Sequence, residues 1–183
     1  MATSGSKPAT TVTRGDELFL DTLRRELYTA VLSDVLDGFG LTGQSMPPRI
    51  RPLDDDLVLA GFARTGQFRE VSGVVRGENP YELEIAIIDD LKPGEVVAFG
   101  CYGSNRIAPW GELLTTAAQQ RGAVGAVTDG FVRDVRGIRN VKFPVFHGGI
   151  APLDSKGRGK VVAIDVPIEC AGVRIDPGDL IFG

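Results

Sequence analysis

Two adjacent residues of opposite charge, Arg133 and Asp134, follow an apolar segment, and a helical pattern begins upstream at Gly111. The first N–H groups of a helix lack internal partners and carry partial positive charge, which suits a carboxylate or a phosphate. A guanidinium adds a planar fork that matches a carboxylate or a keto oxygen. The carboxylate of Asp134 would repel a bound anion unless a divalent cation lay between the carboxylate and the anion. Oxygen ligands and few histidines favour Mg²⁺ or Mn²⁺ over zinc as that cation.

A structural interpretation of the same residues stays open, because an adjacent Arg and Asp in a turn are usually a solvated pair that contributes little. Glu112, at the start of the helix, favours the helix dipole without any catalytic role. The glycine-rich segment at residues 100–111 matches neither a P-loop nor a GxGxxG fingerprint. His147 is the only histidine, which nearly excludes a zinc site made of several His and Cys ligands. We interpret His147 as structural.

A strand–helix–strand unit is predicted to position these residues. Its parts are mostly apolar, with strands at residues 95–101 and 123–128 and a helix at residues 111–121. Leu113 is among the side chains expected to face inward from this helix. If the two strands are parallel neighbours, the crossover is right-handed and both strands end at one edge of the sheet, where ligands bind in open α/β folds. The start of the helix, Arg133 and Asp134 should therefore converge.

The rest of the pattern predicts further helices and short strands. The expected elements are a helix at residues 16–37, a strand at 57–68, a helix starting at 79–80, and strands at 143–146, 161–166, 173–175 and 180–182. The first helix carries an apolar stripe from Leu20 to Val35. Gly61 is a possible bulge, and Asp129 and Gly130 should turn the chain. The last strands should form an antiparallel or mixed sheet, with His147 at the end of one strand.

Composition limits the class of protein. The chain of 183 residues fits one domain, and we expect a flexible tail at residues 1–15 before a domain at residues 16–183. The formal net charge is −4 and Lys and Arg form no run, which argues against nucleic acid as a partner. No apolar stretch approaches the roughly 18 residues of a membrane span, so no membrane partner is expected. Cys101 and Cys170 form no CxxC pair, which favours a cytoplasmic location.

The segments around the charged pair resemble the core signature of the RraA-like family, at residues 111–114, 121–127 and 129–135. Nearly all of the chain after the tail is covered, since typical segments also occur at residues 33–37, 46–50 and 154–159. The family includes 4-hydroxy-4-methyl-2-oxoglutarate aldolases, oxaloacetate decarboxylases and the regulator of ribonuclease E activity A.

This resemblance implies a fold, a site and an activity. The fold is an α/β structure of the swivelling β/β/α type, an αββα sandwich, assembled as a homotrimer or hexamer with sites between subunits. Asp134 would hold Mg²⁺ or Mn²⁺. The substrate would bind Arg133 and the backbone amides of Gly111, Glu112, Leu113 and Leu114. The implied activity is metal-dependent cleavage or decarboxylation of a short 2-oxo acid to pyruvate, in which Arg133 stabilises the enolate and Glu112 orients a water that moves protons.

Two departures from the family pattern bear on the activity. Aldolases of the family often carry an acid at the position of Gly137, and its loss argues against aldol cleavage more than against metal binding or decarboxylation. The chain ends at Gly183, before the C-terminal strand and helix that are usual in the family. The alternative function is a non-catalytic regulator of ribonuclease activity that binds a protein partner. A quinone-precursor methyltransferase is least favoured, because the sequence has no adenosyl-binding glycine motif.

Overall fold

The computed structural model describes residues 14–183, in which helices and strands are interspersed. The helices are α1 (Arg14–Glu26), α2 (Thr29–Gly38), α3 (Glu82–Asp89), α4 (Glu112–Gln120) and α5 (Val135–Asn140). The strands are β1 (Arg51–Pro52), β2 (Ala60–Glu70), β3 (Glu95–Gly100), β4 (Gly125–Val132), β5 (Val145–Ile150), β6 (Gly159–Ile164), β7 (Ile168–Cys170), β8 (Val173–Ile175) and β9 (Leu180–Phe182). The predicted tail, residues 1–15, lies outside the described residues except for its last two, which belong to α1.

A seven-stranded sheet lies at the centre, in the order β1-β5-β4-β3-β2-β6, with β9 also paired to β2. Strands β5, β4, β3 and β2 are parallel, whereas β1, β6 and β9 run antiparallel at the edges. Every residue of β3 is buried, as the apolar run predicts for a strand covered on both faces. The predicted single-domain α/β fold is confirmed, and β3 and β4 are the expected parallel neighbours.

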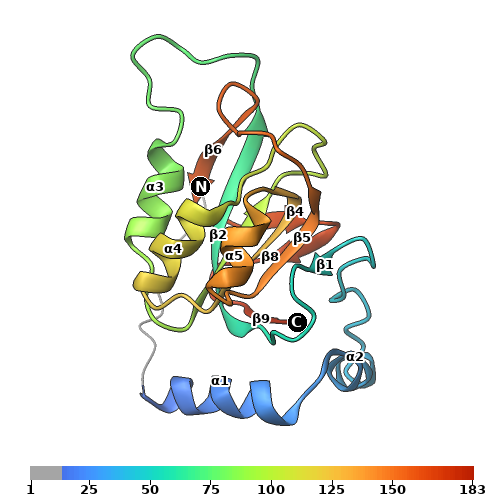
Figure 1. Cartoon of the computed structure of the whole chain (residues 1–183). Helices are drawn as coiled ribbons and strands as arrows, with labels where there is room; N and C mark the ends of the chain where they lie inside the picture. Colours follow the sequence, from blue (N-terminus) through green and yellow to red (C-terminus); the bar gives the residue numbers. More distant parts are fainter. Residues whose placement is uncertain (1–13) are drawn as a thin grey trace, which may run out of the picture.

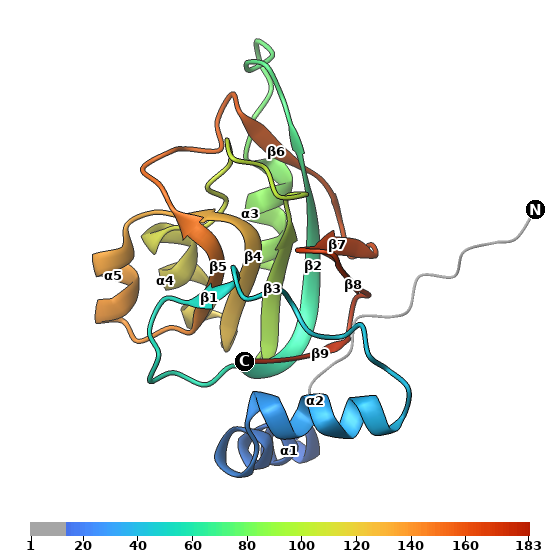
Figure 2. The same ribbon diagram turned by 90° about the vertical axis from the view of Figure 1, so that its right-hand side faces the viewer.

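Helices α3, α4 and α5 cover one face of the sheet, and the β7–β8 hairpin lies against the other (Figures 1 and 2). The core between helices and sheet contains Phe68, Phe99 and Trp110. The rings of Phe68 and Phe99 meet edge to face, with centroids 5.1 Å apart. The indole Nε1 of the buried Trp110 donates a hydrogen bond to Thr115 Oγ1 at 2.8 Å. The start of α4 is therefore anchored to the core.

The predicted helix at residues 16–37 is wrong in extent, because two helices occupy this segment. Tyr28 separates them with an extended backbone, at φ −142° and ψ 160°. Leu20 and Leu23 are buried and pack with Ala60 of β2. Val35 is 52% exposed and α2 buries none of its residues, so the predicted stripe does not continue along the second helix. Within residues 14–183, no helix is long and apolar enough to cross a membrane.

The predicted turn at Asp129 and Gly130 is also wrong, because both residues lie inside β4. The Asp129 carboxylate accepts the backbone N–H groups of Cys101, Gly103 and Ala171 at 2.6, 2.8 and 3.2 Å. An acidic side chain in a buried strand is unusual, but these three hydrogen bonds satisfy it. Asp129 thus ties the end of β3 and the loop after it to the segment between β7 and β8.

Several smaller expectations need correction. Strand β2 begins at Ala60, and α3 begins at Glu82 after the predicted start. Gly61 is not at a bulge; an added Cβ there would lie 2.6 Å from the Gly94 carbonyl oxygen, so close packing requires the glycine. The last strands join a mixed sheet or an antiparallel pair, as expected, with β5 in the parallel part; His147 lies within β5 and not at its end. This histidine is buried, and its Nδ1 has no hydrogen-bond partner in the described part of the chain.

Candidate active site

The predicted convergence at the edge of the sheet is present in the structure. Trp110 forms a parallel bridge with Val132, and the Arg133 N–H donates to the Trp110 carbonyl at 3.0 Å. The start of α4 and the Arg133–Asp134 pair are therefore held together by backbone hydrogen bonds. Gly111 has no side chain that could cap α4, so within residues 14–183 the first N–H groups of the helix are uncapped and can bind a ligand.

Gly111 is packed tightly against the charged pair. A Cβ at this position would lie 2.8 Å from Asp134 Oδ2 and 3.2 Å from Arg133 Cγ. The backbone of Gly111 is extended, at φ −159°, so its conformation would suit any residue. A side chain at position 111 would therefore displace the Asp134 carboxylate and press against the Arg133 side chain.

Asp134, the acid of the charged pair, precedes α5 with an uncommon backbone conformation. It is left-handed, at φ 55° and ψ 33°, a region that costs free energy for non-glycine residues and is enriched at functional sites. Its carboxylate lies 3.6 Å from Arg133 Nε. Within residues 14–183, this carboxylate accepts no hydrogen bond, and no group of three or more His, Cys, Asp or Glu side chains could hold a metal. A cation here would need oxygen ligands from water and substrate beside Asp134.

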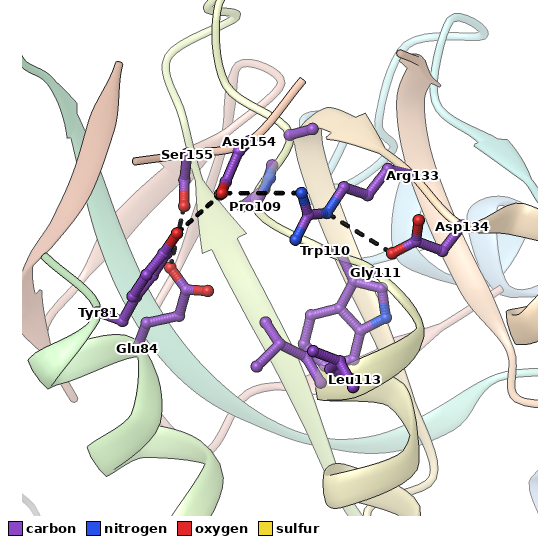
Figure 3. A pocket seen from close by; sticks show the side chains of 12 residues that line it. Tyr81, Glu84, Pro109, Trp110, Gly111, Leu113, Arg133, Asp134, Asp154 and Ser155 are labelled. Carbon is purple, nitrogen blue, oxygen red and sulfur yellow. Dashed lines mark hydrogen bonds and ion pairs between the residues drawn. The ribbon is translucent and has the colours of Figure 1, made fainter. Parts of the chain in front are cut away.

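A small pocket opens beside this pair, with room for a few water molecules and a cavity volume of about 40 Å³. Of the residues predicted from the sequence, it is lined by Gly111, Leu113, Leu114, Arg133 and Asp134. Leu113 was expected to face inward, but it is 79% exposed because the first turn of α4 forms the rim. Arg133 lies between two acids, with Nη1 3.8 Å from Asp154 Oδ2 on the side away from Asp134 (Figure 3).

Glu112 does not line this pocket. Its carboxyl group lies against α5, where a Cβ at Gly137 would overlap it. It borders a shallow depression together with Asp134 and residues of α5. Aldolases of the family often have an acid at position 137. Because this chain has glycine there, the Glu112 carboxyl group can occupy the space.

The opposite wall of the pocket was not predicted from the sequence. It consists of Tyr81, Glu84, Asp154 and Ser155 (Figure 3). The Tyr81 hydroxyl donates to Asp154 Oδ2 at 2.8 Å, and Ser155 Oγ donates to Glu84 Oε2 at 3.5 Å. One signal could have found Glu84: it occupies the same face of α3 as Ile87 and Ile88, where an acid is out of place.

These groups influence one another's protonation. Burial raises the pKa of Glu84 to about 7, and the charge of Asp154 adds to this effect. Burial opposes the ionisation of Asp154. Hydrogen bonds from the Tyr81 hydroxyl and the Lys156 amide, together with the charge of Arg133, outweigh burial, so the pKa of Asp154 is lowered. Burial and the bond to Asp154 raise the pKa of Tyr81 to about 12. At neutral pH the wall therefore carries a charged Asp154, a protonated Tyr81 and a Glu84 that can hold or release a proton.

Comparison with known proteins identifies the family. The family model described as "RraA-like: Aldolase/RraA" matches residues 29–183. The chain belongs to the RraA-like family. A relative from Halalkalibacterium halodurans, provisionally named a 4-hydroxy-4-methyl-2-oxoglutarate aldolase, is 35% identical over 87% of this chain and 70% of its own. A protein of Thermus thermophilus named 4-hydroxy-4-methyl-2-oxoglutarate aldolase is 28% identical over 86% of this chain and 87% of its own.

The RraA-like fold is also found by comparison with solved structures. The crystal structure of Streptomyces coelicolor RraAS2, described as an unusual member of the RNase ES inhibitor RraA protein family, superposes with a TM-score of 0.79. It is 26% identical, and the match covers 96% of this chain and 83% of that one. The sequence resemblance to the RraA-like family is therefore confirmed, and its members include proteins named as enzymes and as inhibitors.

Gly111→Ala is expected to lower kcat/KM by about a hundredfold for any reaction catalysed at this pocket, because a displacement of about 1 Å in positioning groups has effects of this size. The new methyl group must push Asp134 and Arg133 out of place, while the extended backbone at position 111 accepts alanine. Steady-state kinetics and a thermal melt of the same variant separate activity from folding. Gly43→Ala is the matched control, since nothing lies within 4 Å of a Cβ there. Equal kcat/KM values for Gly111→Ala and Gly43→Ala would contradict the tight packing of Gly111 against Asp134 and Arg133.

Proposed function

We propose that this RraA-like protein is a divalent-metal-dependent lyase that breaks a carbon–carbon bond in short 2-oxo acids and releases pyruvate. The observation that carries the proposal is the convergence of Arg133, Asp134 and the uncapped start of α4 on one pocket. The aldolase names of two relatives support the same class of reaction.

The proposed roles follow from the chemistry of each group. The free N–H groups at residues 111–114 bind the substrate carboxylate through the positive end of the helix. Arg133 donates to the keto oxygen and stabilises the negative charge that develops there as the C3–C4 bond breaks. Glu112, which faces the depression beside Asp134, orients a water that moves protons. The leaving fragment is an aldehyde or ketone in retro-aldol cleavage, or carbon dioxide in decarboxylation, and protonation at C3 completes pyruvate.

Asp134 is the proposed metal ligand, and its surroundings fit Mg²⁺ or Mn²⁺. Its carboxylate is about half exposed and accepts no hydrogen bond in the described part of the chain, so it is available to a cation. Mg²⁺ usually binds through one or two carboxylates and keeps several waters, which agrees with a site that offers one acid. When bound, such a cation would supply Lewis acidity toward the substrate oxygens.

The test is pyruvate release from a series of 2-oxo acids: oxaloacetate, 4-hydroxy-4-methyl-2-oxoglutarate and 4,5-dihydroxy-2-oxopentanoate. We expect turnover with Mg²⁺ or Mn²⁺ that stops with EDTA and returns when metal is added in excess. A reaction with metal but without protein measures the background. Release at that background rate for every acid would contradict the lyase.

A second candidate function, binding of a protein partner, is favoured by a different observation. Apolar side chains on and after α1 and α2 are exposed; this α1–α2 apolar surface comprises Leu18, Phe19, Tyr28, Val35, Phe39 and Leu41. Such surfaces usually mark an interaction site. A second copy of the chain, within a trimer or hexamer, is the proposed occupant, and the mass in solution tests it. If the protein is a monomer and has no lyase activity, an inhibitor role is favoured. The Streptomyces relative belongs to a family that is named for this role.

A further inference from the structure

Among the described residues that line the pocket, Glu84 is the only buried acid. It belongs to the first turn of α3, is 7% exposed, and shares the pocket with Arg133 and Asp134. One carboxyl oxygen accepts a hydrogen bond from Ser155 Oγ at 3.5 Å, and the other points toward the middle of the pocket (Figure 3). This carboxyl group has no other hydrogen bond within residues 14–183. Such weak bonding makes its burial costly, so a role in folding does not explain it.

The charges around Glu84 leave its proton mobile near neutral pH. Burial raises the pKa of Glu84 to about 7, and the negative charge of Asp154 adds to this effect. The hydrogen bond from Ser155 and the positive charge of Arg133 act in the opposite direction and limit the rise of the pKa. Both the acid and its carboxylate are therefore populated at neutral pH.

The other titratable groups near Glu84 keep one protonation state at this pH. Burial raises the pKa values of the Tyr81 hydroxyl and of the Cys101 thiol, so both groups stay protonated. Asp154 stays ionised because its pKa is lowered. Glu84 alone among these groups can give and accept a proton near pH 7. A buried acid of this kind, facing a pocket, is typical of a residue that transfers protons.

Protonation of C3 is the step of the proposed reaction that needs an acid inside the pocket. Arg133 and the start of α4 hold the 2-oxo acid end of the substrate, and Asp134 is the proposed metal ligand. Glu112 borders the depression beside Asp134 and does not line this pocket. Glu84 lies across the pocket from Asp134, on the other side of Arg133 (Figure 3). It is therefore placed to reach the substrate from the wall opposite the proposed metal.

We propose that Glu84 is a catalytic residue that gives C3 of the enolate its proton, and that it removes a C3 proton from bound pyruvate in the reverse direction. This inference rests on the proposed lyase function and adds a residue to its mechanism. The electron pair of the enolate double bond takes the Glu84 proton and forms the C3–H bond, while C2 regains its carbonyl. Glu84 is left as a carboxylate, which water reprotonates. The water oriented by Glu112 then serves the oxygen-bound proton, so each acid serves a different proton.

The experiment follows C3 proton transfer by itself. Pyruvate is incubated with Mg²⁺ and protein in D₂O, and deuterium in its methyl group is measured by NMR; metal without protein gives the background. We expect wild type to exchange these protons and Glu84→Gln to do so about a hundredfold more slowly, the usual effect of losing a general acid–base group. Glu82→Gln, an exposed acid in the same turn of α3, is the matched control and should exchange like wild type.

Two further readouts separate proton transfer from pocket structure. Oxalate resembles the enolate of pyruvate in shape and charge, so Glu84→Gln should bind oxalate with Mg²⁺ as wild type does, as measured by calorimetry. Glu84→Asp keeps an ionisable group and should exchange faster than Glu84→Gln. Removal of a C3 proton requires the carboxylate form, so exchange by wild type should rise as the pH increases through about 7 and level off above it. Glu84→Gln should lack this rise.

The outcomes distinguish the inference from the proposed function. Exchange by Glu84→Gln at the wild-type rate would overturn the role of Glu84, and so would a Glu84→Asp rate as low as that of Glu84→Gln. If wild type releases pyruvate from 2-oxo acids but exchanges no C3 protons of pyruvate, the lyase stands and the inference fails, because a protein group that protonates the enolate must also act in reverse. If wild type releases no pyruvate from any of the acids, the lyase and the inference fail together.

Discussion

Asp134→Asn is expected to reduce metal-dependent pyruvate release by about a hundredfold or more, since even partners of metal ligands have effects of 10–100-fold. The substitution removes the charge that would attract the cation and leaves the size of the side chain. Asparagine tolerates the left-handed backbone at this position, with φ 55°, better than alanine does. The loss should therefore appear in kcat/KM and in metal affinity while the melting temperature stays near that of wild type.

The measurement is a titration of Mg²⁺ or Mn²⁺ against turnover for wild type and variant. Wild type should saturate, and the variant should show a much weaker metal dependence. Asp56→Asn tests whether loss of any surface acid has the same effect. Wild-type turnover and an unchanged metal titration in Asp134→Asn would show that Asp134 is not a metal ligand.

Asp129→Ala is expected to lower the free energy of unfolding by about 3–5 kcal/mol, the range for loss of a buried hydrogen-bond network. The carboxylate is 5% exposed and accepts three backbone N–H groups, from Cys101, Gly103 and Ala171. Alanine leaves the N–H groups of Cys101 and Ala171 buried without an acceptor and removes the acceptor of the part-buried Gly103 N–H. The loop after β3, which leads to Trp110 and α4, should loosen as a result, and activity should fall with stability.

Urea unfolding of wild type, Asp129→Ala and Asp129→Asn measures this effect. Asparagine keeps one acceptor oxygen but presents an NH₂ group to the remaining donors, so its loss of stability should be intermediate. A change below about 1 kcal/mol in Asp129→Ala would mean that water replaces the carboxylate at all three N–H groups.

The edge of the sheet where the site lies could be predicted because its causes are local or topological. Apolar runs specify β3 and β4, and a short helical segment between parallel strands must cross over right-handedly. Gly111 and Arg133 then have to meet, whatever the details of packing. The predictions were wrong where the local signal contradicted the tertiary environment. Asp129 and Gly130 have the composition of a turn, but the donors that hold Asp129 inside β4 come from two distant segments.

Side-chain direction was the other limit. Leu113 was expected to face inward, yet it forms the rim of the pocket. The Glu112 carboxyl group lies against α5 and borders the depression beside Asp134, and its role in orienting a water stays a prediction. Both residues lie in the first turn of α4, where hydrophobic periodicity does not tell which face is covered. That coverage depends on α5, a helix of six residues that the sequence pattern did not predict.

By itself, the sequence determined the α/β class, the RraA-like family and the meeting of Arg133 and Asp134 with the start of α4. These features follow from apolar periodicity, chain topology and short motifs, which can be recognised in short stretches of the sequence. Only the tertiary structure decided that Glu84 and Asp154 face Arg133 across the pocket. The two acids come from α3 and from the loop after β5, and their approach depends on how α3 packs against the sheet, which no local pattern encodes.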